Sequence, residues 1–316
     1  MKTKYIIITG VAGMIGSELL EQIIHKKNYV IYGMDNFVLG KKKFIKKFEK
    51  KKNFKFFKID ISKKIPDRIL KKIDNNISEI WLLAANSDIN LGNKNEKIDY
   101  INTFLSTKNT FESLESKIKS HTKVIFTSSS AIYGTVKKKI DENFLNFKPE
   151  TNYGLMKLFC ENYLLYKYSK LNFMLNIFRF PNVVGENLTH GIIYDFLKKK
   201  KLKNNVFQVL GNGNQQKPYS YSKEIIDAML FVSSLNKKQV IVNLGHGDNG
   251  IKVKKIVKLF YKYFNLSKTI KYQKKLRGWD GDIPKYSYST KKLKKLGYTF
   301  KKDSLNSLKA CLLNIK

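Results

Sequence analysis

The stretch Tyr5-Ile6-Ile7-Ile8-Thr9-Gly10-Val11-Ala12-Gly13-Met14-Ile15-Gly16 decides the fold of this chain. Its apolar first part is typical of a buried β-strand, and the segment Gly16–Lys26 that follows is typical of a helix. Glycines at this spacing make a tight turn, let a pyrophosphate approach the backbone and let the helix pack close to the strand. The helix N-terminus then offers free N–H groups to phosphate oxygens. We predict that this segment is a loop that binds the phosphates of a dinucleotide, and an ordinary glycine-rich turn is the alternative. The residues predicted to contact the cofactor are Gly10, Gly13, Met14, Ile15 and Gly16.

An acidic residue stands where the second predicted strand, Val30–Met34, ends. This residue, Asp35, is followed by Asn36 and lies about 20 residues past the glycine loop. A carboxylate there accepts hydrogen bonds from the adenosine ribose and repels a 2′-phosphate, which favours NAD over NADP. A lysine from elsewhere could still meet a 2′-phosphate in so lysine-rich a chain. We assign Asp35 and Asn36 to the cofactor site.

Two later strand ends are further candidates for cofactor contacts. Asp60-Ile61 follows the predicted strand Phe54–Ile59, and Ala84-Ala85 follows a strand predicted at Ile80–Ala84. Both pairs would lie at the carboxyl edge of a parallel sheet, next to an adenine and a pyrophosphate. Plain strand ends without a ligand are the alternative interpretation.

Strand-like and helix-like segments alternate through the first half of the chain. Further strands are predicted at Val124–Ser128, Leu175–Phe180 and Val240–Leu244, and further helices at Asn102–Ile118 and Tyr153–Ser169. This alternation predicts an α/β fold of the Rossmann type, a doubly wound parallel sheet with helices on both faces. We expect residues 1–184 to form the NAD-binding domain, with 222–246 returning to it. Residues 185–221 and 247–316 would form a smaller substrate-binding lobe.

The composition is that of a globular protein with an unusual charge. The 316 residues are 42% hydrophobic and carry 61 Lys and Arg against 25 Asp and Glu, a formal charge of +36. The lysines are spread along the whole chain without the aromatic ladder of an RNA-binding surface, so compositional drift is favoured over a nucleic-acid partner.

No apolar run approaches the length that spans a bilayer. Two scattered cysteines, Cys160 and Cys311, indicate neither a disulfide framework nor a zinc site, and we expect a cytoplasmic protein.

A tyrosine four residues before a lysine puts both side chains on one face of a helix. The lysine charge favours the phenolate, which suits the tyrosine as a general acid and base. The pattern occurs eight times in this chain, so context must choose among the copies. Only Tyr153 and Lys157 open a long helix soon after a strand that ends in hydroxyls, Ser128-Ser129-Ser130. A serine-rich loop beside an ordinary helix surface is the alternative.

At this point the chain resembles the extended short-chain dehydrogenase/reductase family, and within it the NAD-dependent nucleotide-sugar epimerase/dehydratase group, to which UDP-glucose 4-epimerases belong. The resemblance covers nearly the whole chain in order. It is carried by Thr9–Gly16, Asp35-Asn36, Asp60-Ile61, Leu83–Asn86, Asn102, Ser128–Gly134, Tyr153–Lys157, Arg179–Gly185, Leu210–Gln215, Gly281-Asp282 and Leu296–Tyr298.

The resemblance implies roles for individual residues. Ser129 would be the catalytic hydroxyl, Tyr153 the base and Lys157 its activator, with Tyr153 and Lys157 also touching the cofactor. Asn102 and Phe180 would contribute to the cofactor site. Asn182 would contact the phosphate region of a nucleotide sugar. The family also implies a homodimer formed through two helices per subunit.

Departures from the family pattern limit which reactions and which diphosphate contacts are expected. The dehydratases carry an Asp-Glu pair after the position of Ser129, whereas Ser130-Ala131 stands here, so dehydration is not expected. Lys217 takes the place of a diphosphate-binding arginine and loses the bidentate fork. A second such arginine is replaced by Trp279, with Arg277 two residues earlier as the candidate contact.

The histidines complete the candidates. The four histidines share no metal-ligand spacing, so no metal is expected. His190 is a candidate for the substrate pocket, with a structural role as the alternative.

We therefore expect an NAD-dependent epimerase that acts at C4 of a nucleotide-linked hexose through a 4-keto intermediate. A nucleotide-sugar dehydrogenase or reductase with net redox change would use the same residues and is the nearest alternative. A non-catalytic Rossmann protein that binds a partner through its basic surface is the remote one.

Overall fold

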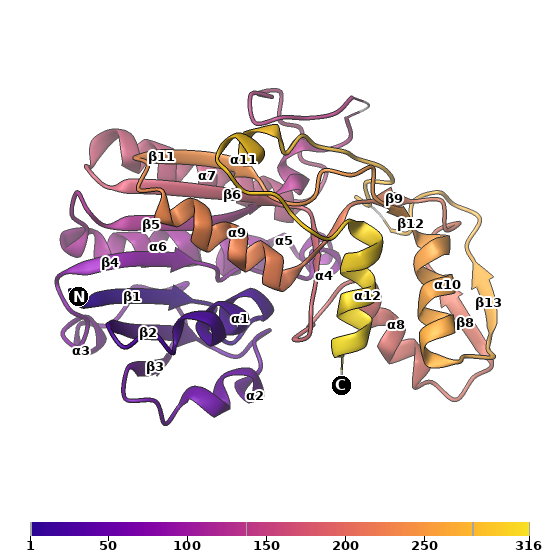
Figure 1. Cartoon of the computed structure of the whole chain (residues 1–316), viewed down its shortest axis with the longest axis horizontal. Coiled ribbons are helices and arrows are strands. Elements are labelled where there is room, and N and C mark those ends of the chain that lie inside the picture. Colours follow the sequence, from indigo (N-terminus) through magenta and orange to yellow (C-terminus); the bar gives the residue numbers. More distant parts are fainter. Residues whose placement is uncertain (1, 137, 280, 316) are drawn as a thin grey trace.

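The computed structural model describes residues 2–136, 138–279 and 281–315. Seven strands form one parallel sheet (Figure 1). In spatial order they are β3 (Phe54–Lys58), β2 (Tyr29–Asp35), β1 (Lys4–Thr9), β4 (Ile77–Leu82), β5 (Lys123–Ser129), β6 (Met174–Phe180) and β11 (Gln239–Asn243). The order reverses between β1 and β4, and such a switch point is where open α/β sheets bind ligands.

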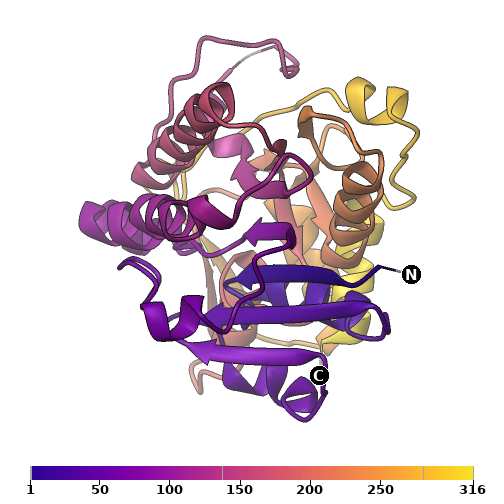
Figure 2. The same cartoon turned by 90° about the vertical axis from the view of Figure 1, so that its left-hand side faces the viewer.

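Alternate residues of β1 face two different cores, because side chains point to opposite faces along a strand. Ile6 and Ile8 pack in one core with Leu19, while Ile7 packs in the other with Phe111. Helices therefore cover both faces (Figure 2). The first face carries α1 (Met14–Ile23), α2 (Lys42–Ile45), α9 (Ser222–Ser234) and α11 (Lys291–Lys295), and the second carries α3 (Asp67–Leu70), α6 (Ser106–Leu114) and α7 (Asn152–Lys170). The short helices α4 (Ile89–Lys94) and α5 (Glu96–Asp99) lead from β4 toward α6.

The doubly wound parallel sheet predicted from the sequence is confirmed, with differences at element ends. The strand expected at residues 80–84 runs from Ile77 to Leu82, which leaves Ala84 and Ala85 in the loop beyond it. The helix expected at residues 102–118 is interrupted: a π-helical turn, Tyr100–Leu105, precedes α6 and a 3₁₀ turn follows it.

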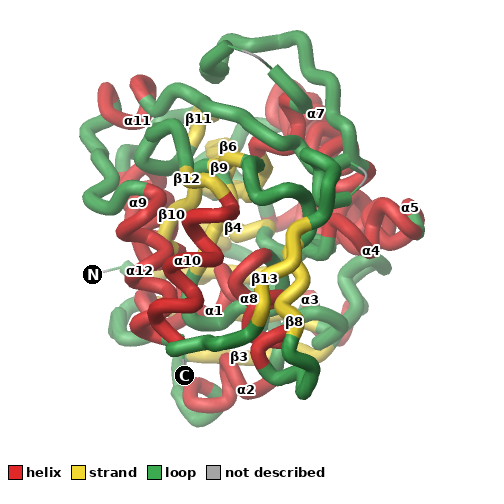
Figure 3. The backbone as a smooth tube through the Cα atoms, turned by 90° about the vertical axis from the view of Figure 1, so that its right-hand side faces the viewer, coloured by secondary structure: helices red, strands yellow, loops and turns green. Residues whose placement is uncertain are grey.

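A smaller lobe lies beyond the carboxyl edge of the sheet (Figures 1 and 3). Its strands form three two-stranded pairs that the sequence did not predict: β7 (Asn182–Val184) with β10 (Tyr219–Tyr221), β8 (Val206–Val209) with β13 (Thr269–Tyr272), and β9 (Gln216–Lys217) with β12 (Ile251–Lys252). Its helices are α8 (Ile192–Lys200), α10 (Val253–Phe264) and α12 (Ser304–Asn314). Phe196, Phe207 and Phe260 pack against one another in edge-to-face and tilted arrangements at the centre of its separate core. Within the described residues, no helix combines the length and apolar character needed to cross a bilayer.

Candidate active site

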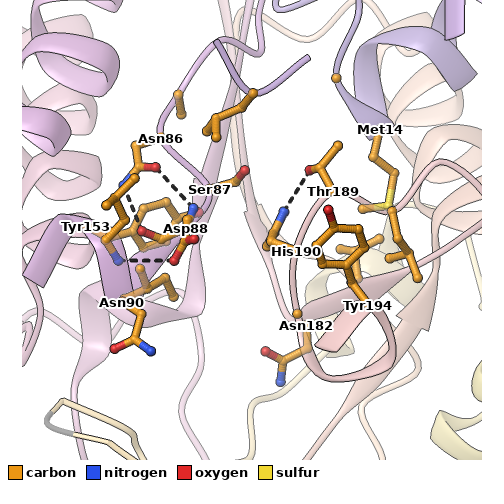
Figure 4. Close-up of a pocket in the computed structure, with 18 of the residues that line it drawn as sticks. Met14, Asn86, Ser87, Asp88, Asn90, Tyr153, Asn182, Thr189, His190 and Tyr194 are labelled. Carbon is orange, nitrogen blue, oxygen red and sulfur yellow. Dashed lines mark hydrogen bonds between the residues drawn. The ribbon is translucent and has the colours of Figure 1, made fainter. Parts of the chain in front are cut away.

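A cavity of about 660 Å³ lies between the carboxyl edge of the sheet and the smaller lobe. Figure 4 shows two walls of it, with Asp88 and Tyr153 on one and His190 and Tyr194 on the other. Most of the candidate residues named from the sequence line this cavity: Gly10, Gly13, Met14, Ile15, Gly16, Asp35, Asn36, Ile61, Ala84, Ala85, Asn102, Ser129, Tyr153, Lys157, Phe180, Asn182, His190 and Lys217.

The glycine loop leaves no room for side chains where α1 meets the sheet. A Cβ on Gly16 would lie 2.2 Å from the carbonyl oxygen of Gly10, and a Cβ on Gly10 would lie 2.9 Å from Cα of Ala84. Gly10 also has a φ of 67°, which favours glycine. No side chain caps the first turn of α1, so its N–H groups face the cavity as a pyrophosphate requires. The loop fits a dinucleotide.

Asp35 is the buried acid at the end of β2. Its carboxylate accepts backbone N–H groups from Ala12 at 3.0 Å and Phe37 at 2.7 Å, so it ties the glycine loop to the strand end. Burial raises the pKa of this carboxyl, and the backbone hydrogen bonds oppose that rise. Asp35 lines the cavity while it braces the loop.

The structure does not bring Asp60 to the cavity wall. Its carboxylate accepts hydrogen bonds from the backbone N–H and the hydroxyl of Ser62, at 3.0 Å and 2.7 Å, and so closes the turn after β3. Ile59 and Ile61 line the cavity on either side of it. Of the predicted pair Asp60-Ile61, the structure therefore places Ile61 in the cavity lining and Asp60 in the turn behind it.

Ser129, Tyr153 and Lys157 meet at the carboxyl end of β5. The hydroxyl of Thr151 caps α7 by accepting from the backbone N–H of Gly154 at 3.0 Å, which starts the helix at this point. Tyr153 is hydrogen-bonded to Ser129. The Lys157 ammonium donates to the carbonyl of Thr127 at 2.6 Å and lies 5.7 Å from the centre of the Tyr153 ring. The three residues form one connected group.

Burial dominates the ionisation of this group. It raises the pKa of Tyr153 to about 12, although the hydrogen bond to Ser129 opposes the rise. It lowers the pKa of Lys157 to about 8. The sequence predicted that the lysine charge would lower the pKa of Tyr153, but desolvation of the phenolate outweighs any such effect here.

A buried ion pair holds α7 against the sheet below the catalytic group. The Arg179 guanidinium donates two hydrogen bonds to the Glu161 carboxylate, at 3.0 Å and 2.7 Å, and a third to the hydroxyl of Tyr133. Both charged side chains are at most 4% exposed. Because Glu161 lies one helical turn after Lys157, the pair fixes the position of the catalytic lysine.

The loop after β4 adds functional candidates that the sequence did not reveal. Asn86 is fully buried and donates to the Asp99 carboxylate at 2.7 Å and to the carbonyl of Asp88 at 2.9 Å. The side-chain oxygen Oδ1 of Asn86 accepts the Asp88 backbone N–H at 3.1 Å. Ser87 and Asp88 therefore enter the cavity wall on a clamped backbone. The motif Leu83–Asn86 marked this loop, but nothing in it distinguished Asp88.

The opposite wall comes from the smaller lobe. The Asn182 amide donates to the carbonyl of Pro218 at 3.3 Å and to the hydroxyl of Tyr286 at 3.2 Å. Nδ1 of His190 lies 3.0 Å from the hydroxyl of Thr189, and burial lowers the pKa of the ring. Lys217 lines the cavity but is paired with Asp282.

Arg277 lies elsewhere. Its guanidinium is paired with Glu150 at 2.8 Å, and its side chain is 45% exposed. It is not among the described residues that line the cavity, while Trp279 is. The predicted diphosphate contact from Arg277 is not supported by this geometry, because Glu150 draws the side chain away.

The glycine loop, the buried Asp35 and the Ser129–Tyr153–Lys157 group define a dinucleotide-dependent α/β enzyme of the short-chain dehydrogenase type. The chain belongs to the NAD dependent epimerase/dehydratase family, whose profile matches residues 6–245. The resemblance seen in the sequence is therefore confirmed, and with it NAD as the cofactor.

Several known proteins are similar to this chain. A putative UDP-glucose 4-epimerase of Methanocaldococcus jannaschii is 32% identical over 251 residues, which cover 77% of each protein. The fold matches that of UDP-glucuronic acid 4-epimerase from Bacillus cereus, solved with UDP-glucuronic acid and NAD, with a TM-score of 0.84 at 23% identity over 98% of each chain. It also matches UDP-N-acetylglucosamine 4-epimerase from Methanobrevibacter ruminantium, with a TM-score of 0.83 at 22% identity over 99% of this chain and 98% of the other.

Proposed function

We propose that this protein is an NAD-dependent epimerase that inverts C4 of a nucleotide-linked hexose. The observation that carries the proposal is the Ser129–Tyr153–Lys157 group, which lies in the same cavity as the glycine loop. The similarity to the putative UDP-glucose 4-epimerase of Methanocaldococcus jannaschii supports the proposal and favours UDP as the nucleotide.

Each catalytic residue has a distinct task. Tyr153 takes the proton of the sugar hydroxyl and later returns it, and Ser129 hydrogen-bonds the same oxygen to direct the transfer. The Lys157 ammonium stabilises the Tyr153 phenolate while it exists. NAD supplies an oxidised nicotinamide that accepts a hydride from the sugar and gives it back, so there is no net redox change.

The substrate is held by the smaller lobe. We assign Asn182 and His190 to contacts with the sugar nucleotide. We assign Lys217 to the diphosphate, so that its ammonium would interact with both the diphosphate and the Asp282 carboxylate. In this proposal residues 1–184 and 222–246 form the NAD-binding domain, and residues 185–221 and 247–316 form the substrate-binding lobe. Two short segments cross these boundaries: β7 (Asn182–Val184) pairs within the smaller lobe, and α11 (Lys291–Lys295) packs on the sheet. Ser130 and Ala131 after the catalytic serine carry no carboxylate, so loss of water is not part of the reaction.

We also propose that two copies of the chain pair through the face formed by α7, α6 and the π-helical turn Tyr100–Leu105 that leads into α6. Tyr100 and Phe159, 46% and 44% exposed, flank Phe104 at ring-centroid distances of 6.0 and 6.1 Å. Exposed aromatic side chains that gather on two adjacent helices are typical of a protein–protein interface.

The two cysteines are buried free thiols, which suits the reducing cytoplasm that we propose as the compartment of this protein.

NMR of the purified protein with UDP-, GDP-, CDP- and dTDP-hexoses, without added cofactor, tests the activity. We expect one sugar to convert to its C4 epimer, and Tyr153→Phe to abolish the conversion. The matched control is Tyr166→Phe, because Tyr166 and Lys170 repeat the same spacing on α7 but Tyr166 is 60% exposed. A keto-sugar formed with an equivalent of NADH would show a net oxidoreductase instead. No conversion of any sugar would contradict the proposal.

A further inference from the structure

Asp88 places a carboxylate on the cavity wall that carries the catalytic tyrosine. It lies beside Tyr153, and His190 faces it from the other wall (Figure 4). The proposed reaction gives Asp88 no role, since Tyr153 and Ser129 handle the proton. A charged group at this place must still affect which sugar can enter.

The backbone of Asp88 is held from both sides. The Asn86 side chain receives its N–H at 3.1 Å and donates to its carbonyl at 2.9 Å. Asn86 is itself fixed by the buried Asp99 and by the Thr103 hydroxyl, which accepts its backbone N–H at 3.1 Å. This network fixes the position of the backbone that carries the Asp88 carboxylate.

One carboxylate oxygen of Asp88 already has a partner. Oδ1 accepts the backbone N–H of Leu91 at 3.1 Å, which caps α4 and fixes the direction of the side chain. Among the described residues, no lysine, arginine or histidine forms an ion pair with Asp88. Apart from the N-terminus of α4 that it caps, its negative charge therefore has no cationic partner among the described residues.

His190, which faces Asp88, does not compensate this charge. Burial lowers the pKa of His190, and the Asp88 charge raises it only in part, so the ring is neutral at neutral pH.

The lysines that line the cavity are engaged elsewhere or lie at its rim. Lys157 donates to the Thr127 carbonyl, and Lys199 donates to the carbonyl of Gln208. Lys217 pairs with Asp282, and in the proposed function its remaining capacity is assigned to the diphosphate. Lys94 and Lys198 are exposed. Within the described residues, a second negative charge next to Asp88 would find no unengaged buried cation.

We propose that Asp88 is a specificity-determining residue: its carboxylate accepts a hydrogen bond from a sugar hydroxyl and excludes sugars that carry a carboxylate of their own. The substrate class is then a nucleotide-linked neutral hexose and not a uronate. This inference rests on the proposed function, in that it places the sugar beside Tyr153. It also sets this chain apart from the Bacillus cereus structure, which holds UDP-glucuronic acid.

Binding of UDP-glucose and UDP-glucuronate tests the proposal. Isothermal titration of the NAD-loaded protein in the Tyr153→Phe background gives both dissociation constants without turnover. We expect UDP-glucuronate to bind roughly a hundredfold more weakly, because two like charges meet at the cavity wall. Asp88→Asn keeps the oxygen that caps α4 and removes the charge, so the ratio should fall below roughly tenfold.

The matched control is Asp303→Asn. Asp303 caps α12 by accepting the backbone N–H of Asn306 at 2.8 Å, the same local contact that Asp88 makes, but it does not line the cavity. This variant should keep the wild-type ratio. Equal binding of both sugars, or a ratio unchanged in Asp88→Asn, would overturn the proposal.

Failure of this inference and failure of the proposed function give different results. If the wild-type protein epimerises UDP-glucose and UDP-glucuronate equally well, the function stands and the role of Asp88 does not. If UDP-glucose binds in preference to UDP-glucuronate but is not converted, the specificity stands and the epimerase activity does not. Binding of neither sugar contradicts both.

Discussion

The cofactor side of the cavity is lined mainly by backbone groups, whereas the sugar side is lined mainly by side chains. The cofactor side presents backbone: glycines at positions 10, 13 and 16, and a helix end without a side-chain cap. The sugar side presents side chains, such as Asp88, Tyr153 and His190, each fixed by its own neighbours. A backbone site tolerates almost no added volume, whereas a side-chain site depends on burial and charge, so substitutions should damage the two sides in different ways.

The largest effect is expected where the sugar side is anchored. Glu161→Gln leaves the Arg179 guanidinium buried without its counter-charge, and we expect a loss of about 3–5 kcal/mol in unfolding free energy. Urea unfolding followed by circular dichroism measures it. The control is Glu115→Gln, which removes the equally short Lys167–Glu115 pair at 2.7 Å. Because that pair is partly exposed, its loss should lower the free energy of unfolding by only about 0–1 kcal/mol. If both variants lost the same unfolding free energy, burial would not be the reason that the Glu161–Arg179 pair stabilises the fold.

A smaller effect, confined to the cofactor, is expected in the glycine loop. Gly16→Ala puts a Cβ 2.2 Å from the Gly10 carbonyl oxygen and 2.7 Å from Cα of Val11, so the loop must move. We expect the NAD dissociation constant to rise roughly a hundredfold, since overpacking costs about 1–3 kcal/mol and falls on the binding loop. Fluorescence titration with NAD measures it. Glu21→Ala, an exposed change on the same helix, should leave it unchanged. Unaltered NAD binding in Gly16→Ala would contradict a backbone-built site.

The ionisation of Lys157 should appear in the pH dependence of turnover. Burial lowers its pKa to about 8, so the side chain is an ammonium below that pH and neutral above it. If the charge stabilises the Tyr153 phenolate, kcat/KM falls above pH 8, by about tenfold per unit once the lysine is mostly neutral. Initial rates between about pH 7 and 10 measure this, with circular dichroism as a check on folding. A rate that keeps rising would mean that ionisation of Tyr153, whose pKa is raised to about 12, limits the reaction instead.

The same contrast explains what the sequence could predict. Glycine spacing, the Tyr153–Lys157 interval and the strand pattern are local features, and they located the sheet and most of the cavity lining. The strand pairs of the smaller lobe are two to four residues long and join distant segments, so no periodicity marked them. Asp88, Tyr286 and the partner of Arg277 depend on which side chains meet in space. The desolvation that governs the pKa of Tyr153 likewise follows from packing and not from spacing.

The smallest effect is expected at Arg277, where the role implied by the family resemblance and the geometry disagree most. Its guanidinium is paired with Glu150 outside the cavity, whereas Lys217 lines the cavity. We therefore expect Arg277→Ala to change KM for the sugar nucleotide by less than about threefold, since an exposed pair contributes about 0–1 kcal/mol. Lys217→Ala should raise KM roughly tenfold, because it removes a charge beside the substrate. Steady-state kinetics on both variants separates the two positions. A large rise in KM for Arg277→Ala alone would mean that the arginine leaves Glu150 and swings inward when substrate binds, so the sugar side would assemble only around its ligand.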